Sequence, residues 1–372
     1  KRVWQIPRNR ADADAMRLAA QWIRESRQPL IVAGGGVHYS DATAALLAFV
    51  ERTGIPVGET QAGKGALRYD HLLNLGALGS TGTDGANIIA READLVIGIG
   101  TRYSDFTTAS KTAFQAEGVR FININVAEFD AYKHNALPLT GDARATLDEL
   151  LELLADFSTG ADYQQRCQAY NAAWDAEVQR IYTLEHEPLL SQGEVVGMVN
   201  TFSREQDVVL CAAGSLPGDL HKLWRTRDPR GYHLEYGYSC MGYEIAGGMG
   251  VAMADPEREV YVMIGDGSYL MMNSEIVTMV QEGIKVTIVL LDNHGFASIG
   301  GLSQSVGSGG FGTHYRARTD DDQLTGEPLP VDYAQNCASL GALVLQARDR
   351  GEFATALEEA RAVKNRPMCI VT

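Results

Sequence analysis

The chain has 372 residues, 45% of them hydrophobic and 21% charged, which is enough for about two domains with buried cores. Its formal net charge is −15, and so acidic a surface repels nucleic acid and anionic membranes, which excludes both as expected partners. No run approaches the roughly 18–20 apolar residues that span a bilayer, and KRVWQIPRNR at the start lacks the apolar stretch of a secretory signal. The five cysteines are widely spaced without a C-x-x-C pair, so we expect neither disulfides nor a zinc site, and a cytoplasmic protein.

The first half of the chain alternates short apolar runs with helical patterns. PLIVAGGGV at 29–37 predicts a buried strand that ends in a glycine turn, and a helix follows from Asp41 to about Thr53. A last helix begins at Asp142, a good N-cap. The other elements expected in this half are strands at 55–60, 95–101 and 120–125 and a helix near 83–93. Apolar strands alternating with helices predict a parallel sheet covered on both faces, so residues 1–157 are expected to form a Rossmann-like domain.

The second half repeats this pattern after a connection. Residues 158–188 contain no strand-like run and predict a partly helical linker. Residues 189–372 are then expected to form a second domain, and the fold class predicted is α/β with two doubly wound parallel sheets. Its predicted strands lie at 208–214, 259–266, 286–293, 342–346 and 368–372, with helices including 243–254 and 268–283. The glycine- and charge-rich segment from Gly300 to Pro330 is either disordered or a lid, and we favour a lid that a ligand orders.

Polar residues follow two strands of the second half. The strand at 259–264 leads into Gly265-Asp266-Gly267-Ser268, and a helix follows at once, which makes a natural anion site. The next strand ends at Asp292-Asn293-His294-Gly295. Neighbouring parallel strands would bring Asn293 beside Asp266, at the sheet edge where open α/β sheets bind ligands. Because Asp266 would repel a phosphate bound at this anion site, a Mg²⁺ ion is expected between the Asp266 carboxylate and the phosphate. A chance G-D-G and a turn-capping Asn293 are the plain alternative, which the matching strand ends disfavour.

These motifs resemble those of thiamin-diphosphate enzymes of the acetolactate synthase and pyruvate decarboxylase type. The family motif runs from G-D-G to N-N, and here Asp292-Asn293 stand in place of N-N, so the second residue, the metal ligand, is kept. The resemblance implies that Asp266, Asn293 and the backbone carbonyl of Gly295 hold Mg²⁺. The diphosphate and a water would complete the octahedron.

Two further segments carry the resemblance. In EYGYSCMGYEIAGGMGVA at 235–252, Met241-Gly242 match the pair whose apolar residue wedges between the two cofactor rings, and the carbonyl of Ser239 would accept a hydrogen bond from the pyrimidine amino group. Ordinary core packing is the alternative for Met241. His294 is expected near the substrate. His221 lies in a predicted amphipathic helix, where a histidine is more often structural. The expected contacts to the cofactor diphosphate are Gly214, Ser215, Gly265, Gly267 and Ser268.

Residues 29–57 and 94–106 resemble the middle domain of the family. Gly34-Gly35-Gly36 is not G-x-G-x-x-G, so we do not expect a dinucleotide site there. In the family a pyrimidine-binding domain, with the glutamate that protonates the pyrimidine, precedes the middle domain. We therefore expect this chain to be an incomplete fragment, inactive alone, of a homodimer or homotetramer.

Within the family, the strings at 235–248, 265–275 and 292–313 are most similar to hydrolases of inositol catabolism. Those enzymes open trihydroxycyclohexane-1,2-dione, a polyhydroxylated cyclic diketone, to 5-deoxyglucuronate. His294, Ser298 and the loop 303–317 could supply the polar lining that such a ring needs. An acetolactate synthase or 2-oxoacid decarboxylase would share every cofactor motif, and a non-catalytic diphosphate-binding module is a further alternative.

Overall fold

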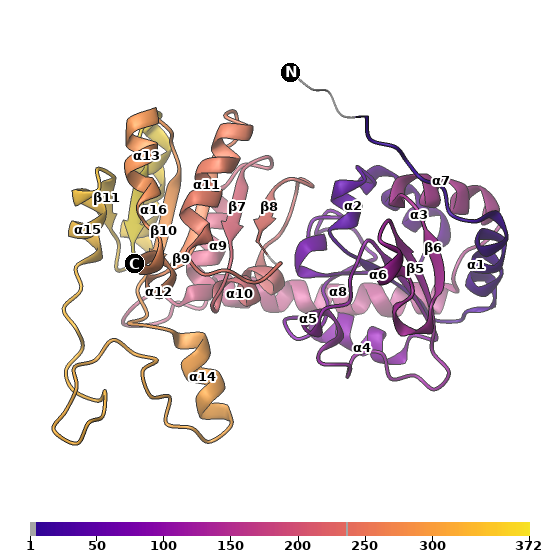
Figure 1. The fold of residues 1–372 in the computed structure, drawn as a ribbon, viewed down its shortest axis with the longest axis horizontal. Helices are drawn as coiled ribbons and strands as arrows, with labels where there is room; N and C mark the ends of the chain where they lie inside the picture. The colour runs from indigo at the N-terminus through magenta and orange to yellow at the C-terminus, as the bar shows by residue number, and fades with distance from the viewer. Residues whose placement is uncertain (1–4, 236) are drawn as a thin grey trace. The chain divides into compact units, whose positions relative to one another are not determined.

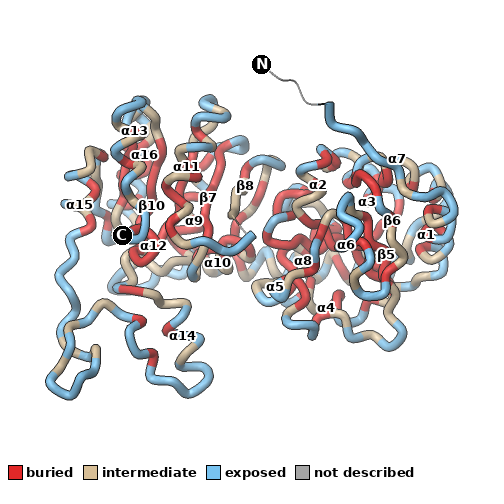
Figure 2. Tube along the Cα trace, in the orientation of Figure 1, coloured by how far each residue is buried: buried red, intermediate tan, exposed pale blue. Residues whose placement is uncertain are grey.

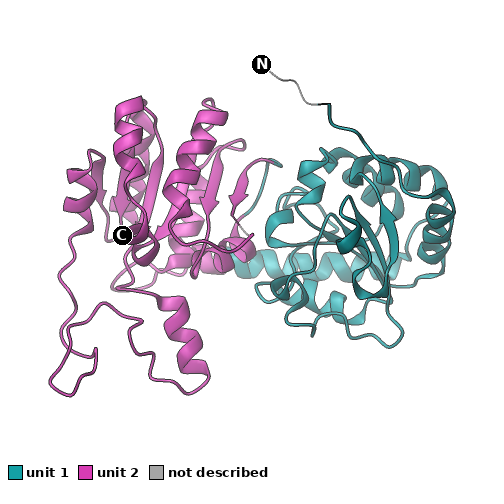
Figure 3. Ribbon diagram, in the orientation of Figure 1, with its two compact units in different colours: residues 1–179, 225–229 teal, residues 180–224, 230–372 magenta. Residues whose placement is uncertain are grey.

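The computed structural model describes residues 5–235 and 237–372 and divides the chain into two compact units (Figures 1 and 3). Unit 1 comprises residues 1–179 and 225–229, and unit 2 comprises residues 180–224 and 230–372. The division falls inside helix α8 (Ala161–Tyr182), within the segment 158–188 predicted as the connection. Each unit holds one six-stranded sheet whose strand pairings are parallel, which confirms the predicted α/β class.

Unit 1 is built on a sheet in the order β3-β2-β1-β4-β5-β6. Its strands are β1 (Pro29–Ala33), β2 (Val57–Glu59), β3 (Asn74–Ala77), β4 (Leu95–Ile99), β5 (Arg120–Asn125) and β6 (Leu137–Thr140). Its helices before α8 are α1 (Ala13–Glu25), α2 (Gly36–Tyr39), α3 (Thr43–Thr53), α4 (Asp84–Glu92), α5 (Asp105–Thr108), α6 (Glu128–Ala131) and α7 (Ala143–Leu153). As predicted, Asp142 caps α7, and its carboxylate accepts the backbone N–H of Ala145 at 3.1 Å.

Unit 2 is built on a sheet in the order β11-β12-β10-β9-β7-β8. Its strands are β7 (Val208–Cys211), β8 (Tyr232–Leu234), β9 (Val260–Gly265), β10 (Thr287–Leu291), β11 (Leu343–Gln346) and β12 (Met368–Val371). Its helices after α8 are α9 (Gln192–Phe202), α10 (Leu216–Leu223), α11 (Tyr243–Ala254), α12 (Asp266–Met271), α13 (Glu275–Glu282), α14 (Ala297–Ser305), α15 (Tyr333–Ser339) and α16 (Arg350–Ala362).

The single helix predicted for 268–283 is wrong. The structure has two helices there, α12 and α13, separated at residues 272–274, and the first begins at Asp266 itself. Asn273 and Ser274 favour turns. The side-chain amide of Asn273 also donates to Asn336 Oδ1 at 3.1 Å, a tertiary contact that helical periodicity does not reveal.

The order of strands in unit 2 creates a point where ligands commonly bind. The chain runs from β7 to β8 on one side and then crosses to β9 on the other side of β7. Open α/β sheets bind ligands outside the carboxyl ends of the strands at such a switch point. The turns that follow β7, β9 and β10 meet at this edge and carry most of the residues singled out in the sequence.

The central strands of both sheets are mostly buried, as the red segments of Figure 2 show, whereas β6, β8 and β11 at the sheet edges are partly exposed. Along β9, Val260 to Ile264 expose at most 1% of their surface, as expected for a strand covered on both faces. By contrast, residues 306–332, between α14 and α15, are mostly exposed. Among the described residues, no helix combines the length and the apolar character that a bilayer crossing requires.

Candidate functional site

The paired strands β9 and β10 bring the two predicted motifs together. Gly265 pairs with Leu291 in the parallel register, so Asp266 and Asp292 leave the sheet side by side. The backbone N–H of Gly295 donates to Asp266 Oδ2 at 2.8 Å, which joins the two turns directly. The turn geometry inferred from the sequence is therefore present in the structure.

Three groups that carry oxygen atoms converge between these turns. The end of the Asn293 side-chain amide lies 3.2 Å from Asp266 Oδ1 and 3.0 Å from the carbonyl oxygen of Gly295. With its nitrogen facing them, Asn293 donates to both; with its oxygen facing them, three oxygens meet, and only a cation would stabilise them. Neighbouring ligands in a Mg²⁺ octahedron lie about 2.9 Å apart, as bonds of roughly 2.05 Å require. The observed spacings fit that geometry.

The electrostatic surroundings of Asp266 also favour a bound cation. The residue is fully buried, and burial together with the nearby charge of Asp292 raises the pKa of its carboxyl, although hydrogen bonds from Gly295 and Tyr333 oppose this. A bound cation would favour the charged form instead. Among the described residues no three His, Cys, Asp or Glu side chains gather as metal ligands. The groups that could bind a metal here are one carboxylate, one amide and one carbonyl, which are oxygen ligands of the kind that Mg²⁺ uses.

The turn that carries Asn293 is anchored to the long segment after α14. Gly295 has φ 141°, and a Cβ atom there would lie 2.5 Å from the carbonyl oxygen of Thr313, so no side chain fits. The backbone N–H of Phe296 donates to that same oxygen at 2.8 Å, and the N–H of Tyr315 donates to the carbonyl of His294 at 2.9 Å. His294 has φ 60°, its ring is mostly exposed, and its Nδ1 lies 3.0 Å from Asp292 Oδ1.

The predicted wedge lies in the turn before α11. Ser239 has φ 56°, a conformation that non-glycine residues rarely adopt and that clusters at functional sites. Met241 is half-buried, and Gly242, with φ 90°, is the N-cap of α11. The carboxylate of Glu235 accepts the backbone N–H of Cys240 at 2.8 Å and stabilises this turn. Sequence reasoning missed Glu235.

The loop after β7 carries Gly214 and Ser215, which lie just before α10. Ser215 Oγ donates to Gln192 Oε1 at 3.0 Å, and Gln192 Nε2 donates to Asp219 Oδ2 at 2.6 Å. Gln192 was not predicted from the sequence, because its partners lie more than 20 residues away. It also lines a cavity of about 530 Å³ together with Asp292, Asn293 and His294 and the ends of β11 and β12.

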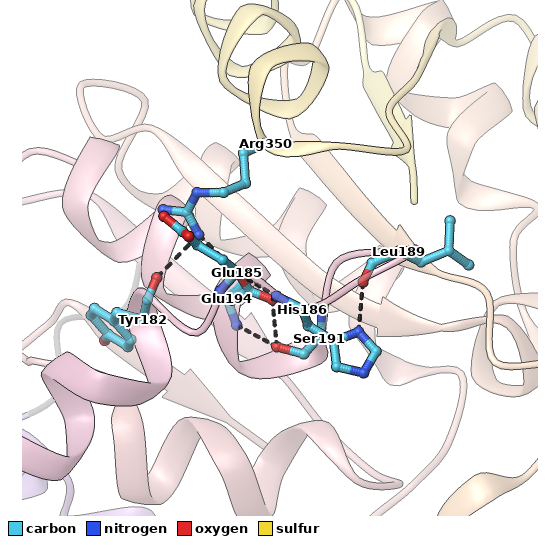
Figure 4. A network of polar contacts seen from close by, with 7 residues as sticks. All are labelled: Tyr182, Glu185, His186, Leu189, Ser191, Glu194 and Arg350. Atoms are coloured by element: carbon cyan, nitrogen blue, oxygen red, sulfur yellow. Dashed lines mark hydrogen bonds and ion pairs between the residues drawn. The ribbon is translucent and has the colours of Figure 1, made fainter.

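The start of α9 holds Gln192 in place. Glu194 is fully buried and accepts the backbone N–H and the hydroxyl of Ser191, at 3.0 and 2.9 Å, in a capping box. It also accepts the backbone N–H of Glu185 at 2.8 Å, and Arg350 donates to it at 3.1 Å (Figure 4). Burial raises the pKa of Glu194, but the hydrogen bonds from Ser191 and Glu185 hold this pKa below its usual value.

The turn after β9 uses its residues in two ways. Gly265 and Gly267 flank Asp266 at the start of α12, where backbone N–H groups are free of helical partners. The side chain of Ser268 is instead buried, and its hydroxyl lies within 2.8 Å of both carboxylate oxygens of Glu244. Glu244, like Glu235 and Gln192, was missed by sequence reasoning.

Comparison with known proteins gives consistent matches for both units. Residues 16–150 match the family described as thiamine pyrophosphate enzyme, central domain, and residues 212–372 match thiamine pyrophosphate enzyme, C-terminal TPP binding domain. Similar curated proteins are named 3D-(3,5/4)-trihydroxycyclohexane-1,2-dione hydrolase. The one from Bacillus cereus (strain AH820) is 41% identical over 386 residues, and the one from Geobacillus thermodenitrificans (strain NG80-2) is 42% identical over 385. Both alignments cover 97% of this chain, which spans only 60% of the length of these relatives.

Proposed function

The chain belongs to the thiamine pyrophosphate enzymes, and we propose that it forms the cofactor-binding part of a hydrolase that opens trihydroxycyclohexane-1,2-dione to 5-deoxyglucuronate. The observation that carries the cofactor part of this proposal is the convergence of oxygen-bearing groups at Asp266, Asn293 and Gly295. The similarity to the named hydrolases supports the substrate.

We propose that these three groups bind Mg²⁺, which in turn holds the cofactor diphosphate. The backbone of Gly265, Gly267 and Ser268, and the loop of Gly214 and Ser215, would contact the diphosphate oxygens. This assignment is supported by the position of both turns at the carboxyl edge of the sheet. Because the hydroxyl of Ser268 is engaged by Glu244, its contact would come from its backbone N–H.

Thiamin diphosphate, when bound, supplies the electron sink for cleavage of the C–C bond between the two carbonyls. In this proposal Met241 orients the cofactor rings and the carbonyl of Ser239 accepts a hydrogen bond from the pyrimidine amino group. The half-buried position of Met241 and the left-handed backbone of Ser239 support these roles. His294 is exposed and directly follows the proposed metal ligand Asn293, and it would contact the hydroxyl groups of the substrate ring.

We further propose that the protein is a cytoplasmic homodimer or homotetramer, as the resemblance implies. Three consecutive apolar side chains at the end of α12 support a partner surface. Leu270, Met271 and Met272 are 40%, 51% and 52% exposed, and Met271 and Met272 lie beside Gly242.

The substrate assignment is tested on a protein that joins this chain to the pyrimidine-binding domain of the family. With Mg²⁺ and thiamin diphosphate, it should release 5-deoxyglucuronate from the cyclic diketone and leave pyruvate unchanged. Turnover of pyruvate instead would favour an acetolactate synthase or a 2-oxoacid decarboxylase. Cofactor binding without turnover of either compound would favour a non-catalytic module.

Met241→Ala should leave Mg²⁺ binding intact in that protein. The exchange of the proton on the reactive carbon of the cofactor for deuterium should slow by about ten- to hundredfold, because small errors in positioning are costly. Proton NMR measures this exchange. Met253→Ala, a substitution at an exposed methionine of α11, the helix that follows the turn of Met241, is the control. An unchanged exchange rate in Met241→Ala would remove the wedge role.

A further inference from the structure

A buried glutamate lies among the three turns that the proposed function uses. Glu244 is only 1% exposed, and it lies in the first turn of α11. Ser268 Oγ lies 2.8 Å from its Oε1 and 2.7 Å from its Oε2. The backbone N–H of Gly242 donates to Oε2 at 3.0 Å, and the N–H of Ala213 approaches Oε1 at 3.4 Å.

Each of these partners adjoins a different part of the proposed site. Gly242 directly follows the wedge Met241, Ser268 belongs to the turn of Asp266, and Ala213 directly precedes Gly214. The N–H of Gly242 also donates to Ser268 Oγ at 2.8 Å, so the wedge turn and the Asp266 turn are bound to one another as well as to the carboxylate. A single side chain therefore joins the turns that follow β7, β8 and β9.

Helix capping alone does not explain this arrangement. A carboxylate near the start of a helix is stabilised by the helix dipole and by one local N–H donor, which Gly242 already supplies. Ser268 is 24 positions away and Ala213 is 31, and both lie on other turns. Burial raises the pKa of Glu244, and the groups of Gly242, Ser268 and Ala213 that contact it carry no charge. Burying a charged carboxylate at this position therefore costs free energy of folding.

We propose that Glu244 is a positioning residue that sets the distance between the wedge turn of Met241 and the diphosphate-binding turn of Ser268. This inference rests on the proposed function for the identity of the ligand. It assigns to Glu244 no contact with the cofactor itself. Its consequence is that loss of the carboxyl group loosens all three turns together and so weakens binding of the cofactor.

The first test is hydrogen–deuterium exchange of the chain without cofactor. In Glu244→Ala, exchange should accelerate at Gly242, at Ala213 and around Ser268, while the interior of α11 remains protected. Glu244→Gln, which keeps the shape and one acceptor, should restore most of the protection. Faster exchange confined to the first turn of α11, or no change, would reduce Glu244 to a helix cap and overturn the proposal.

The second test is calorimetric titration with thiamin diphosphate and Mg²⁺. Glu244→Ala should weaken binding by at least about tenfold, since it removes hydrogen bonds to an ionisable group, and Glu244→Gln should recover most of the loss. Glu275→Ala, a first-turn glutamate of α13, is the matched control and should bind as the unchanged chain does. Equal binding by Glu244→Ala and the unchanged chain would overturn the positioning role. Failure of the unchanged chain to bind, alone and when joined to the pyrimidine-binding domain of the family, with the exchange pattern as expected, would instead count against the proposed function.

Discussion

Asp266→Asn should abolish Mg²⁺-dependent binding of thiamin diphosphate, with a loss of affinity of more than about 100-fold. Even residues that only support a metal ligand contribute about 10- to 100-fold to metal affinity. Asp266 is proposed as the one carboxylate ligand, so its loss should cost more. The substitution keeps the shape of the side chain and removes the charge. Calorimetric titration with and without Mg²⁺ measures the effect.

Asp292→Asn is the matched control for that substitution. It makes the same chemical change at the end of the neighbouring strand and also removes a charge that raises the pKa of Asp266. Asp292 faces His294 and is not a proposed ligand, so binding should stay within a few-fold of the unchanged chain. Equal losses in both variants would mean that the general negative charge of the site, rather than a ligand bond from Asp266, determines binding.

Glu194→Ala should destabilise unit 2 by about 3 kcal/mol. Several donors that Glu194 satisfies would lose their partner, and each buried group left unsatisfied costs roughly 1–3 kcal/mol. The melting temperature should fall by about 6–12 °C, as expected for a domain of roughly 150–250 residues. Thermal unfolding followed by circular dichroism measures this change. Glu358→Ala, at an exposed position of α16, should change it little.

The contribution of Glu194 should also depend on pH. Because its folded-state pKa lies below the ordinary value of 4.5, the stabilisation is fully present above that value. It should be lost as the pH falls through the lowered pKa of the folded state. The difference in stability between the unchanged chain and Glu194→Gln should therefore shrink on acidification. A difference that is constant from neutral pH to below pH 4.5 would contradict the role of the charge.

The sequence predicted those parts of the fold and site that depend on local pattern. Continuous apolar runs indicated β9 and β10, and the residues after each run indicated that Asp266 and Asn293 would meet. The family resemblance inferred from these motifs is confirmed by the matches to both domains. The roles of the individual site residues remain predictions, although the structure brings Asp266, Asn293 and Gly295 together.

What the sequence did not reveal depends on tertiary contacts. Strand β8 has only three residues, Tyr232–Leu234, and is half-buried, so it lacks an apolar run. At the break between α12 and α13, Asn273 contacts Asn336, which lies 63 positions away in the sequence. Glu244 lies within a helical pattern, and its pairing with Ser268 becomes apparent only when the turns after β8 and β9 are placed side by side.

The central claim is that the turns after β7, β9 and β10 form a Mg²⁺-dependent site for thiamin diphosphate. Calorimetric titration of thiamin diphosphate into this chain, with and without Mg²⁺, tests it most directly. We predict binding that requires Mg²⁺ and that strengthens when the pyrimidine-binding domain of the family is joined to the chain. The absence of Mg²⁺-dependent binding in both proteins would contradict the account.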